Sequence, residues 1–216
     1  MKETGIRSIT GLLFAAVVLF SVTWSFWSNV LLWGGVALVG VSEWRRPLSP
    51  KRLVPSLLFS VLMVLLSGVM MMLVWDSQNG FNPVPLLTFI ALIWTNDTGA
   101  YLVGKPLGKH KLMPRVSPGK SWEGLIGGVV LASIVAGLLI AWESAWVGAL
   151  MGLTATTGDL VESAWKRGHG IKDSGAILPG HGGVLDRFDG FLFAAPVFAL
   201  IVHFGGFDFY LNSWFS

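Results

Sequence analysis

Cysteine is absent from the 216 residues of the chain, and histidine occurs only four times. The chain therefore has no disulfide framework, no thiol nucleophile and no thiolate metal site. Charge is also scarce, since Asp, Glu, Lys and Arg make up 12% of the residues. A soluble domain usually carries about twice that share. Any metal site in this chain would be built mainly from carboxylates, which are the ligands of hard ions.

Apolar residues are abundant instead. They make up 53% of the chain, and the mean hydropathy is +0.68. This composition argues against a soluble enzyme, a disordered chain and a nucleic-acid binder. The long apolar runs predict an all-α fold, a polytopic membrane helix bundle with about seven transmembrane helices. The predicted spans are 8–27, 29–44, 54–75, 84–104, 122–142, 146–165 and 188–207.

The basic residues predict the orientation of these spans. All 15 Lys and Arg residues lie before the first span or in the segments after the second, fourth and sixth. The segments on the other side, 76–83 and 208–216, contain none. The positive-inside rule then places the N-terminus in the cytoplasm. The net charge of +3 follows from this topology and requires no nucleic-acid partner.

The start of the chain bears on where the protein resides. The first span follows Lys2 and Arg7 and is not followed by a small-residue cleavage site. We therefore expect an uncleaved anchor and not a signal peptide. The whole pattern predicts an integral protein of a bacterial-type cytoplasmic membrane, with an active site that faces the cytoplasm.

The sequence suggests two regions. Residues 1–80 are predicted to be N-terminal transmembrane helices that serve as an anchor, in lipid access or in oligomer contacts. Residues 81–216 are predicted to form a catalytic transmembrane region with two cytoplasmic loops, 105–121 and 166–187. These loops are rich in Gly, Pro, Lys and His and carry most of the bases, so chemistry is expected there.

Acidic residues near the cytoplasmic ends of the spans indicate a site, because an ionisable group inside a membrane is costly and usually functional. Helical spacing places Asp159, Ser163 and Lys166 on one face of the sixth span. One interpretation is that each acid forms a structural ion pair with a nearby base. The acids that gather at this depth are Asp97, Asp159, Glu162, Asp186 and Asp189.

The gathering of these acids beside many bases favours a different interpretation. Carboxylates without cysteine suit Mg²⁺, and clustered Lys and Arg suit phosphate groups. Together they are typical of phosphoryl or nucleotidyl transfer. The residues alone therefore predict a membrane enzyme that acts on phosphates at the cytoplasmic face.

A long motif lies between residues 163 and 189. It consists of Ser163, Lys166, Arg167, Lys172, Asp173, Pro179, Gly180, His181, Gly182, Gly183, Asp186, Arg187 and Asp189. This pattern resembles the signature of the phosphatidate cytidylyltransferase (CDP-diacylglycerol synthase) family, with its spacing intact. The segments 96–124 and 158–163 also resemble the family, and the resemblance covers roughly residues 84–200.

The chain departs from the family pattern at three positions. The family usually has Lys, Thr and an aliphatic residue where this chain has Gly119, Ser121 and Trp165. The chain also looks short for the family, so we expect fewer N-terminal helices.

The resemblance implies transfer of a cytidylyl group from CTP to phosphatidate in phospholipid biosynthesis, giving CDP-diacylglycerol and pyrophosphate. It implies Mg²⁺ held by Asp159 and Asp186, and it leaves room for a second cation such as K⁺ and for a homodimer. The candidate catalytic residues are Asp159, Asp186, Asp189, Lys172, Asp173 and His181. The candidate substrate-binding residues are Asp97, Lys109, Lys120, Ser163, Lys166, Arg167 and Arg187.

Three alternatives stay open on the sequence. A polyprenol or dolichol kinase would share the charge layout and the metal chemistry. An ion-coupled transporter would have its acids at the membrane midplane and an internal repeat, and the sequence has neither pattern. A membrane scaffold would use the acids only for structural ion pairs.

Overall fold

The computed structural model describes residues 3–46, 53–76, 80–177 and 182–205. Their contacts divide the chain into two compact units, which are described separately. The first unit comprises residues 1–83 and 165–189, and the second comprises residues 84–164 and 190–216. Apart from two short hairpins, the described elements are helices, which confirms the all-α prediction.

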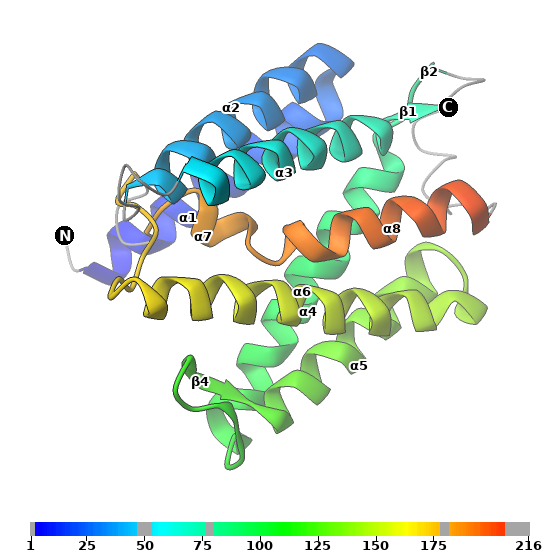
Figure 1. The fold of residues 1–216 in the computed structure, drawn as a ribbon. Helices are drawn as coiled ribbons and strands as arrows, with labels where there is room; N and C mark the ends of the chain where they lie inside the picture. Colours follow the sequence, from blue (N-terminus) through cyan, green and yellow to red (C-terminus); the bar gives the residue numbers. More distant parts are fainter. Residues whose placement is uncertain (1–2, 47–52, 77–79, 178–181, 206–216) are drawn as a thin grey trace. The chain divides into compact units, whose positions relative to one another are not determined.

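The first unit contains a group of long helices and one small hairpin. Its elements are α1 (Glu3–Trp24), α2 (Phe26–Arg45), α3 (Leu53–Met72), β1 (Trp75–Asp76), β2 (Gly80–Phe81) and α7 (Leu185–Phe188). Helices α2 and α3 run side by side (Figure 1). Strands β1 and β2 pair antiparallel, with Trp75 opposite Phe81.

A serine capping box sets the boundary between α1 and α2. Ser25 is extended, with φ −167° and ψ 167°. Its hydroxyl accepts from the N–H of Ser28 at 3.1 Å, and the Ser28 hydroxyl accepts from the N–H of Ser25 at 3.0 Å. Since this reciprocal pair satisfies free N–H groups at a helix start, α1 ends at Trp24, a few residues before the predicted boundary.

The second unit is built on two closely packed helices. Its elements are α4 (Val84–Leu107), β3 (Lys111–Met113), β4 (Ser117–Ser121), α5 (Trp122–Leu139), the 3₁₀ turn η1 (Trp142–Ser144), α6 (Ala145–Gly168) and α8 (Phe191–Gly205). The last residues of α6, from Trp165 onward, belong to the first unit. The core includes Phe89, whose ring lies 5.1 Å from that of Phe191 and 5.3 Å from that of Phe198.

Small residues let the helices of the second unit approach closely. A Cβ on Gly128 of α5 would lie 2.6 Å from the backbone oxygen of Asn96 on α4. A Cβ on Gly148 of α6 would overlap the backbone oxygen of Ala132 on α5. Helices inside a membrane associate without a hydrophobic driving force, and they commonly use such close contacts between small residues.

Three helices in the described part of the chain are long and apolar enough to cross a membrane. They are Val84–Leu107, Trp122–Leu139 and Leu185–Gly205, the last of which combines α7 and α8. Shorter apolar helices occupy Ser8–Trp24 and Leu57–Met72. Helices α2 and α6 form where spans were predicted, but neither meets the same measure of length and composition. The count of seven spans therefore stays a prediction.

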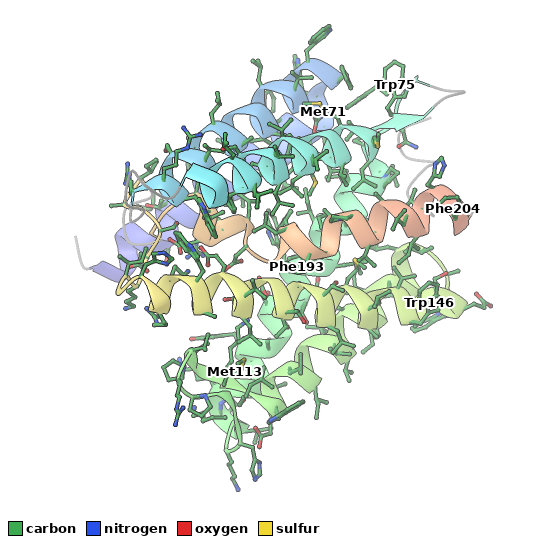
Figure 2. All side chains as sticks on the ribbon, in the orientation of Figure 1. Met71, Trp75, Met113, Trp146, Phe193 and Phe204 are labelled. Carbon is green, nitrogen blue, oxygen red and sulfur yellow. The ribbon has the colours of Figure 1, made fainter. Side chains whose placement is uncertain are left out.

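The helix surfaces agree with a membrane environment. Large apolar side chains project outward from the described helices, among them Trp146 on α6 and Phe193 and Phe204 on α8 (Figure 2). Phe204 is 79% exposed. So many exposed large apolar side chains are uncommon on soluble monomers and are typical of a membrane or protein contact.

Candidate active site

The end of α6 turns the chain back on itself. Gly170 has φ +70°, a conformation that glycine adopts without steric cost. The N–H of Ile171 donates to the carbonyl of Lys166, and the N–H of Gly170 donates to that of Arg167, both at 3.1 Å. This pair of bonds is a Schellman motif, which ends a helix and satisfies its last carbonyls. Arg167 strengthens the turn, since its Nη1 donates to the carbonyl of Ile171 at 2.8 Å.

Asp186 lies in α7 and is held from several directions. Its Oδ2 accepts from the N–H of Ser174 at 2.9 Å, from the hydroxyl of Ser174 at 3.0 Å and from the N–H of Gly183 at 2.8 Å. Its Oδ1 accepts from the ammonium of Lys166 at 2.6 Å. We call Asp186, Lys166, Ser174, Gly183 and Glu43 the Asp186 cluster.

The ion pair in this cluster is buried. The side chains of Lys166 and Asp186 are 8% and 7% exposed. A buried charge that loses its partner is strongly destabilising, whereas the intact pair contributes little net stability. The pair therefore fixes the position of both side chains more than it stabilises the fold.

Glycine is required beside Asp186. Gly182 has φ +83°, and a Cβ there would lie 2.7 Å from Oδ2 of Asp186. A Cβ on Gly183 would lie 2.5 Å from the hydroxyl of Ser174. The glycines of the signature thus let the backbone approach a carboxylate of the chain itself.

Glu43 on α2 belongs to the same cluster. It is fully buried, and its Oε1 accepts from the N–H of Val184 at 3.1 Å. Its Oε2 accepts from the N–H of Leu185 at 2.9 Å and from the hydroxyl of Ser174 at 3.2 Å. The hydroxyl of Ser174 therefore lies within hydrogen-bond distance of both carboxylates.

Sequence reasoning missed Glu43 and Ser174. A signal for Glu43 does exist, because it lies in the last turn of an apolar helix, where the helix dipole disfavours a carboxylate. An acid retained at such a position needs partners from elsewhere in the chain. Ser174 follows the signature pair Lys172 and Asp173 directly, but a serine in a loop has no distinguishing pattern.

A second cluster lies within the second unit. Lys120 on β4 forms an ion pair of 2.5 Å with Oδ2 of Asp159 on α6. Ser163 donates to Oδ1 of Asp159 at 3.0 Å, which confirms that Asp159 and Ser163 share a helix face. The Asp159 side chain is 33% exposed, so solvent or a ligand can reach it. We call these three residues the Asp159 cluster.

The hairpin β3–β4 presents Lys120. The sequence indicated only a loop here, whereas Lys111 pairs with Ser121 and Met113 with Ser117. The start of α5 closes the hairpin, because Glu123 accepts from the N–H of His110 at 3.2 Å and contacts its Nδ1 at 2.6 Å. The hairpin thereby fixes the strand that carries the lysine.

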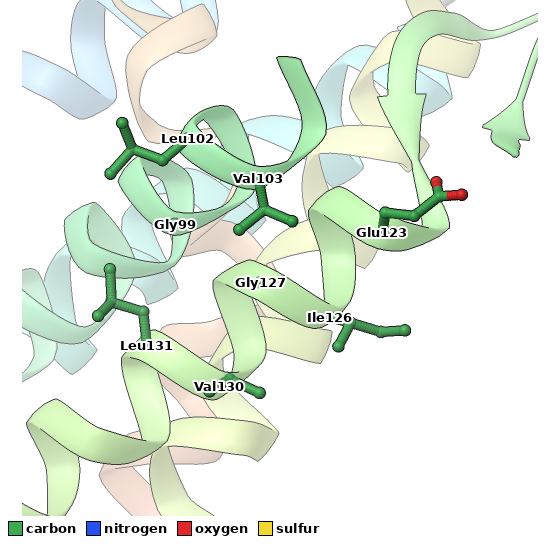
Figure 3. Close-up of a pocket in the computed structure, with 8 residues that line it drawn as sticks. All are labelled: Gly99, Leu102, Val103, Glu123, Ile126, Gly127, Val130 and Leu131. Atoms are coloured by element: carbon green, nitrogen blue, oxygen red, sulfur yellow. The ribbon is translucent and has the colours of Figure 1, made fainter. Parts of the chain in front are cut away.

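An apolar groove of about 450 Å³ lies between α4 and α5 (Figure 3). Glu123 stands at one end, and its carboxylate is already bonded to His110. The groove suits apolar groups and offers no base for a phosphate. Its lining comprises Gly99, Leu102, Val103, Glu123, Ile126, Gly127, Val130 and Leu131.

The remaining candidates are more scattered. Lys172, Asp173, Arg187 and Lys109 are exposed, and Asp97 is exposed on α4. Asp189 occupies the C-cap position of α7 and is half-buried. His181, with its neighbours Pro179 and Gly180, lies outside the described residues. The structure thus gathers Lys166 with Asp186, and Lys120 and Ser163 with Asp159.

Two of the three departures from the family pattern leave the local structure undisturbed. Ser121 is the N-cap of α5, and its hydroxyl accepts from the N–H of Gly124 at 3.1 Å, a role that Thr also fills. Gly119 is exposed, and a Cβ there would meet nothing within 4 Å. The position therefore has room for the lysine that the family usually carries.

The third departure, Trp165, is part of an aromatic column in the first unit. Its ring stacks on that of Trp44 with centroids 3.8 Å apart and an interplanar angle of 10°. The other face of Trp44 stacks on Phe59 at 3.9 Å and 3°. The substitution at position 165 is therefore accommodated by packing against α2 and α3.

Comparison with known proteins adds to this geometry. Residues 51–205 match the sequence pattern of the Cytidylyltransferase family. A phosphatidate cytidylyltransferase of Staphylococcus aureus strain COL is 41% identical over 152 residues, which are 67% of this chain and 58% of that protein. The protein of the same name from Staphylococcus haemolyticus is 43% identical over 125 residues, or 54% of this chain and 48% of that protein.

The protein of that name from Staphylococcus saprophyticus is 37% identical over 152 residues, again 67% of this chain and 58% of the relative. The chain thus spans about half the length of these relatives. The family match nevertheless covers most of the chain, including the signature, the Asp159 cluster and every residue of the Asp186 cluster except Glu43. The chain belongs to the cytidylyltransferase family.

Proposed function

We propose that the protein is a membrane-bound phosphatidate cytidylyltransferase. It transfers a cytidylyl group from CTP to phosphatidate and releases pyrophosphate. One observation carries the proposal: Lys166 and Gly183, from opposite ends of the signature, both bond the buried carboxylate of the signature residue Asp186. Relatives with this name are about 40% identical to the chain over about two thirds of its length.

In the proposed reaction an oxygen of the phosphatidate phosphate attacks the α-phosphorus of CTP. A new P–O bond forms as the bond from the α-phosphorus to the bridging oxygen of the β-phosphate breaks, and pyrophosphate leaves. The attacking oxygen is already ionised near neutral pH, so no strong general base is needed. The contribution of the chain is then to position two polyanions and stabilise the developing charge.

The lysines and arginines supply the positive charge. Lys120 and Lys166 each hold a carboxylate, so their ammonium groups are fixed beside the residues proposed to act. Arg167, Lys172 and Arg187 are exposed and are proposed to contact lipid phosphate or pyrophosphate. Asp97 and Lys109 are further candidates for contact with CTP, and Asp173, His181 and Asp189 for the reaction itself.

The two carboxylates also suit Mg²⁺. Asp159 is open to solvent, and Oδ1 of Asp186 accepts only the Lys166 bond among those described. No group of three or more His, Asp or Glu side chains suited to a metal occurs among the described residues. Mg²⁺ typically takes one or two carboxylates and completes its shell with water and phosphate oxygens. Bound at either carboxylate, it would neutralise charge on the CTP phosphates, and K⁺ is a candidate second cation.

The membrane placement extends this proposal. The distribution of the bases supports a cytoplasmic N-terminus, seven spans and an active site that opens to the cytoplasm. CTP would then reach the clusters from the cytoplasm and phosphatidate from the bilayer. A homodimer is compatible with the exposed apolar helix surfaces.

Labelled CTP tests the proposed reaction. Purified protein in detergent is incubated with Mg²⁺, phosphatidate and CTP that carries label in either the α- or the γ-phosphate. We expect the α label in the lipid and the γ label in pyrophosphate. Label from the γ-phosphate in the lipid would identify a lipid kinase instead. Product formation in detergent would exclude a pure transporter, which needs two compartments.

Charge-neutral substitutions test the carboxylates. Asp159→Asn and Asp186→Asn are each expected to lower turnover at saturating Mg²⁺ by about tenfold or more. Both acids are paired with lysines, as the scaffold interpretation also expects, so stability is measured alongside. A variant that lost stability and kept near-normal turnover would be a structural residue and not a metal ligand.

A further inference from the structure

We infer that Glu43 is a positioning residue of the proposed active site, and this inference rests on the proposed function. Glu43 lies on α2, outside the residues 51–205 that match the family. It does not contact Asp186 directly in the described bonds. It acts through the backbone and hydroxyl groups that surround Asp186, and so determines where that carboxylate lies.

The bonds of Glu43 reach both sides of the signature loop. On one side it accepts from the hydroxyl of Ser174, and on the other from the N–H groups of Val184 and Leu185. Ser174 and Gly183 each donate a backbone N–H to Asp186. The one hydroxyl hydrogen of Ser174 is shared between Asp186 and Glu43. Each group that holds Oδ2 of Asp186 is therefore itself bonded to Glu43 or adjacent to a residue that is.

The fit around the Glu43 carboxylate is tight. A Cβ on Gly175 would overlap Oε1 of Glu43, and a Cβ on Gly183 would lie 2.5 Å from Oε2. The backbone of the loop thus packs directly on this side chain from two positions. A carboxylate in a fully buried site that accepts two backbone N–H groups is held in one orientation, because leaving either N–H group unpaired is costly.

Both oxygens of Glu43 are needed as acceptors. Each one accepts a backbone N–H, that of Val184 at Oε1 and that of Leu185 at Oε2. Glutamine offers one oxygen and one NH₂ group, so Glu43→Gln would place a donor against a donor at one of the two. Aspartate keeps both oxygens and is shorter by one methylene, so Glu43→Asp should restore part of the function.

The test compares Glu43→Gln with Asn29→Ala. Asn29 is a matched control, since it is a fully buried polar residue on the same helix and its amide donates to the carbonyls of Ser21, Val22 and Ser25. Both substitutions remove buried bonds. Only the first is expected to lower kcat per folded molecule, by about tenfold or more, as loss of an orienting partner typically does.

Hydrogen exchange supplies a readout that does not depend on activity. We expect Glu43→Gln, and not Asn29→Ala, to accelerate amide exchange in residues 183–187, well below the melting temperature. Glu43→Asp should give intermediate exchange and intermediate kcat, and it serves in place of Glu43→Gln if that variant does not fold. Wild-type kcat in a folded Glu43 variant, or unchanged exchange in residues 183–187, would overturn the inference.

The two proposals can fail separately. If the wild-type protein makes no CDP-lipid from CTP and phosphatidate, the proposed function is wrong, and exchange alone decides whether Glu43 holds the Asp186 segment. If the wild-type protein is active, and Glu43→Gln lowers stability but not kcat, as is expected of Asn29→Ala, Glu43 is a structural residue.

Discussion

At the scale of single residues, the two proposed metal carboxylates differ in their surroundings. Asp186 is buried and accepts four hydrogen bonds, whereas Asp159 is one-third exposed and accepts two contacts. A carboxylate with little remaining freedom is pre-organised, and one that is exposed can exchange partners. We therefore expect Asp186 to define the geometry of the site and Asp159 to be the side chain that adapts to ligands.

The buried ion pair gives a stability prediction. Lys166→Met keeps the apolar stem but leaves Asp186 without its cation, which should lower the free energy of unfolding by about 3–5 kcal/mol. Thermal unfolding of the purified protein, followed by circular dichroism, measures the change. Lys111→Met on the exposed face of the hairpin is the control and should melt like the wild-type protein. Equal melting of both variants would contradict the prediction.

Lys120 gives a prediction about substrate binding. Lys120→Ala removes the ammonium that the hairpin presents beside Asp159, and the KM for CTP should rise by about tenfold, the value of one charge-assisted bond. Steady-state kinetics at saturating phosphatidate provide the measurement. Lys111→Ala, on the neighbouring strand, should leave the KM unchanged. A normal KM in Lys120→Ala would remove this lysine from the nucleotide site.

Residue-level pairing was the least predictable part of the site. The sequence identified Asp159, Asp186, Lys120 and Lys166 as candidates, but not which acid meets which base. That choice depends on the hairpin and on the turn at Gly170, whose geometries are set by their own backbone hydrogen bonds and not by the apolar pattern of the sequence. Glu43 was missed because its partners lie more than a hundred residues away in the chain.

At the scale of elements, the contact between α4 and α5 is the most demanding. Gly128→Ala would place a Cβ 2.6 Å from the backbone and side-chain oxygens of Asn96, and helix backbones cannot yield there without separating. We expect a loss of stability of about 1–3 kcal/mol, typical of overpacking. Melting in detergent tests this.

A second glycine on a helix serves as its control. Gly35 lies on α2, and a Cβ there would meet nothing within 4 Å. Gly35→Ala should melt at the same temperature as the wild-type protein or slightly higher, since Ala favours helix over Gly by about 1 kcal/mol. If Gly128→Ala behaved in the same way, the close approach of α4 and α5 would not limit stability.

Helices were predictable from the sequence because long apolar runs separated by polar segments are typical of transmembrane helices. Their ends were less predictable. Ser25 breaks one apolar run through a capping box, and the hairpin β3–β4 forms in a segment whose Gly, Pro and Lys content indicated only a loop. Short strands of this kind depend on their closing contacts, such as that between His110 and Glu123.

At the scale of the whole molecule, topology is the main prediction that follows from the sequence. Because the chain lacks cysteine, a single introduced thiol reports its own location. Gly119→Cys lies on the predicted cytoplasmic side, and its position tolerates a side chain. Ser77→Cys lies in the segment 76–83, which is predicted to be outside.

A membrane-impermeant maleimide distinguishes the two sides. Ser77→Cys should react in intact cells, and Gly119→Cys only after the cells are opened. The reverse result would contradict the orientation predicted from the basic residues. Reaction of both thiols in intact cells would contradict the prediction that an odd number of spans separates positions 77 and 119.

The aromatic column of Phe59, Trp44 and Trp165 has an evolutionary consequence. Both faces of Trp44 are covered, so replacing Trp165 alone with an aliphatic residue would leave one large ring without its stacking partner. The two tryptophans are therefore expected to change together during divergence. In relatives with an aliphatic residue at the position of Trp165, we expect a smaller side chain at that of Trp44, and a chimera that exchanges only one of them should express poorly.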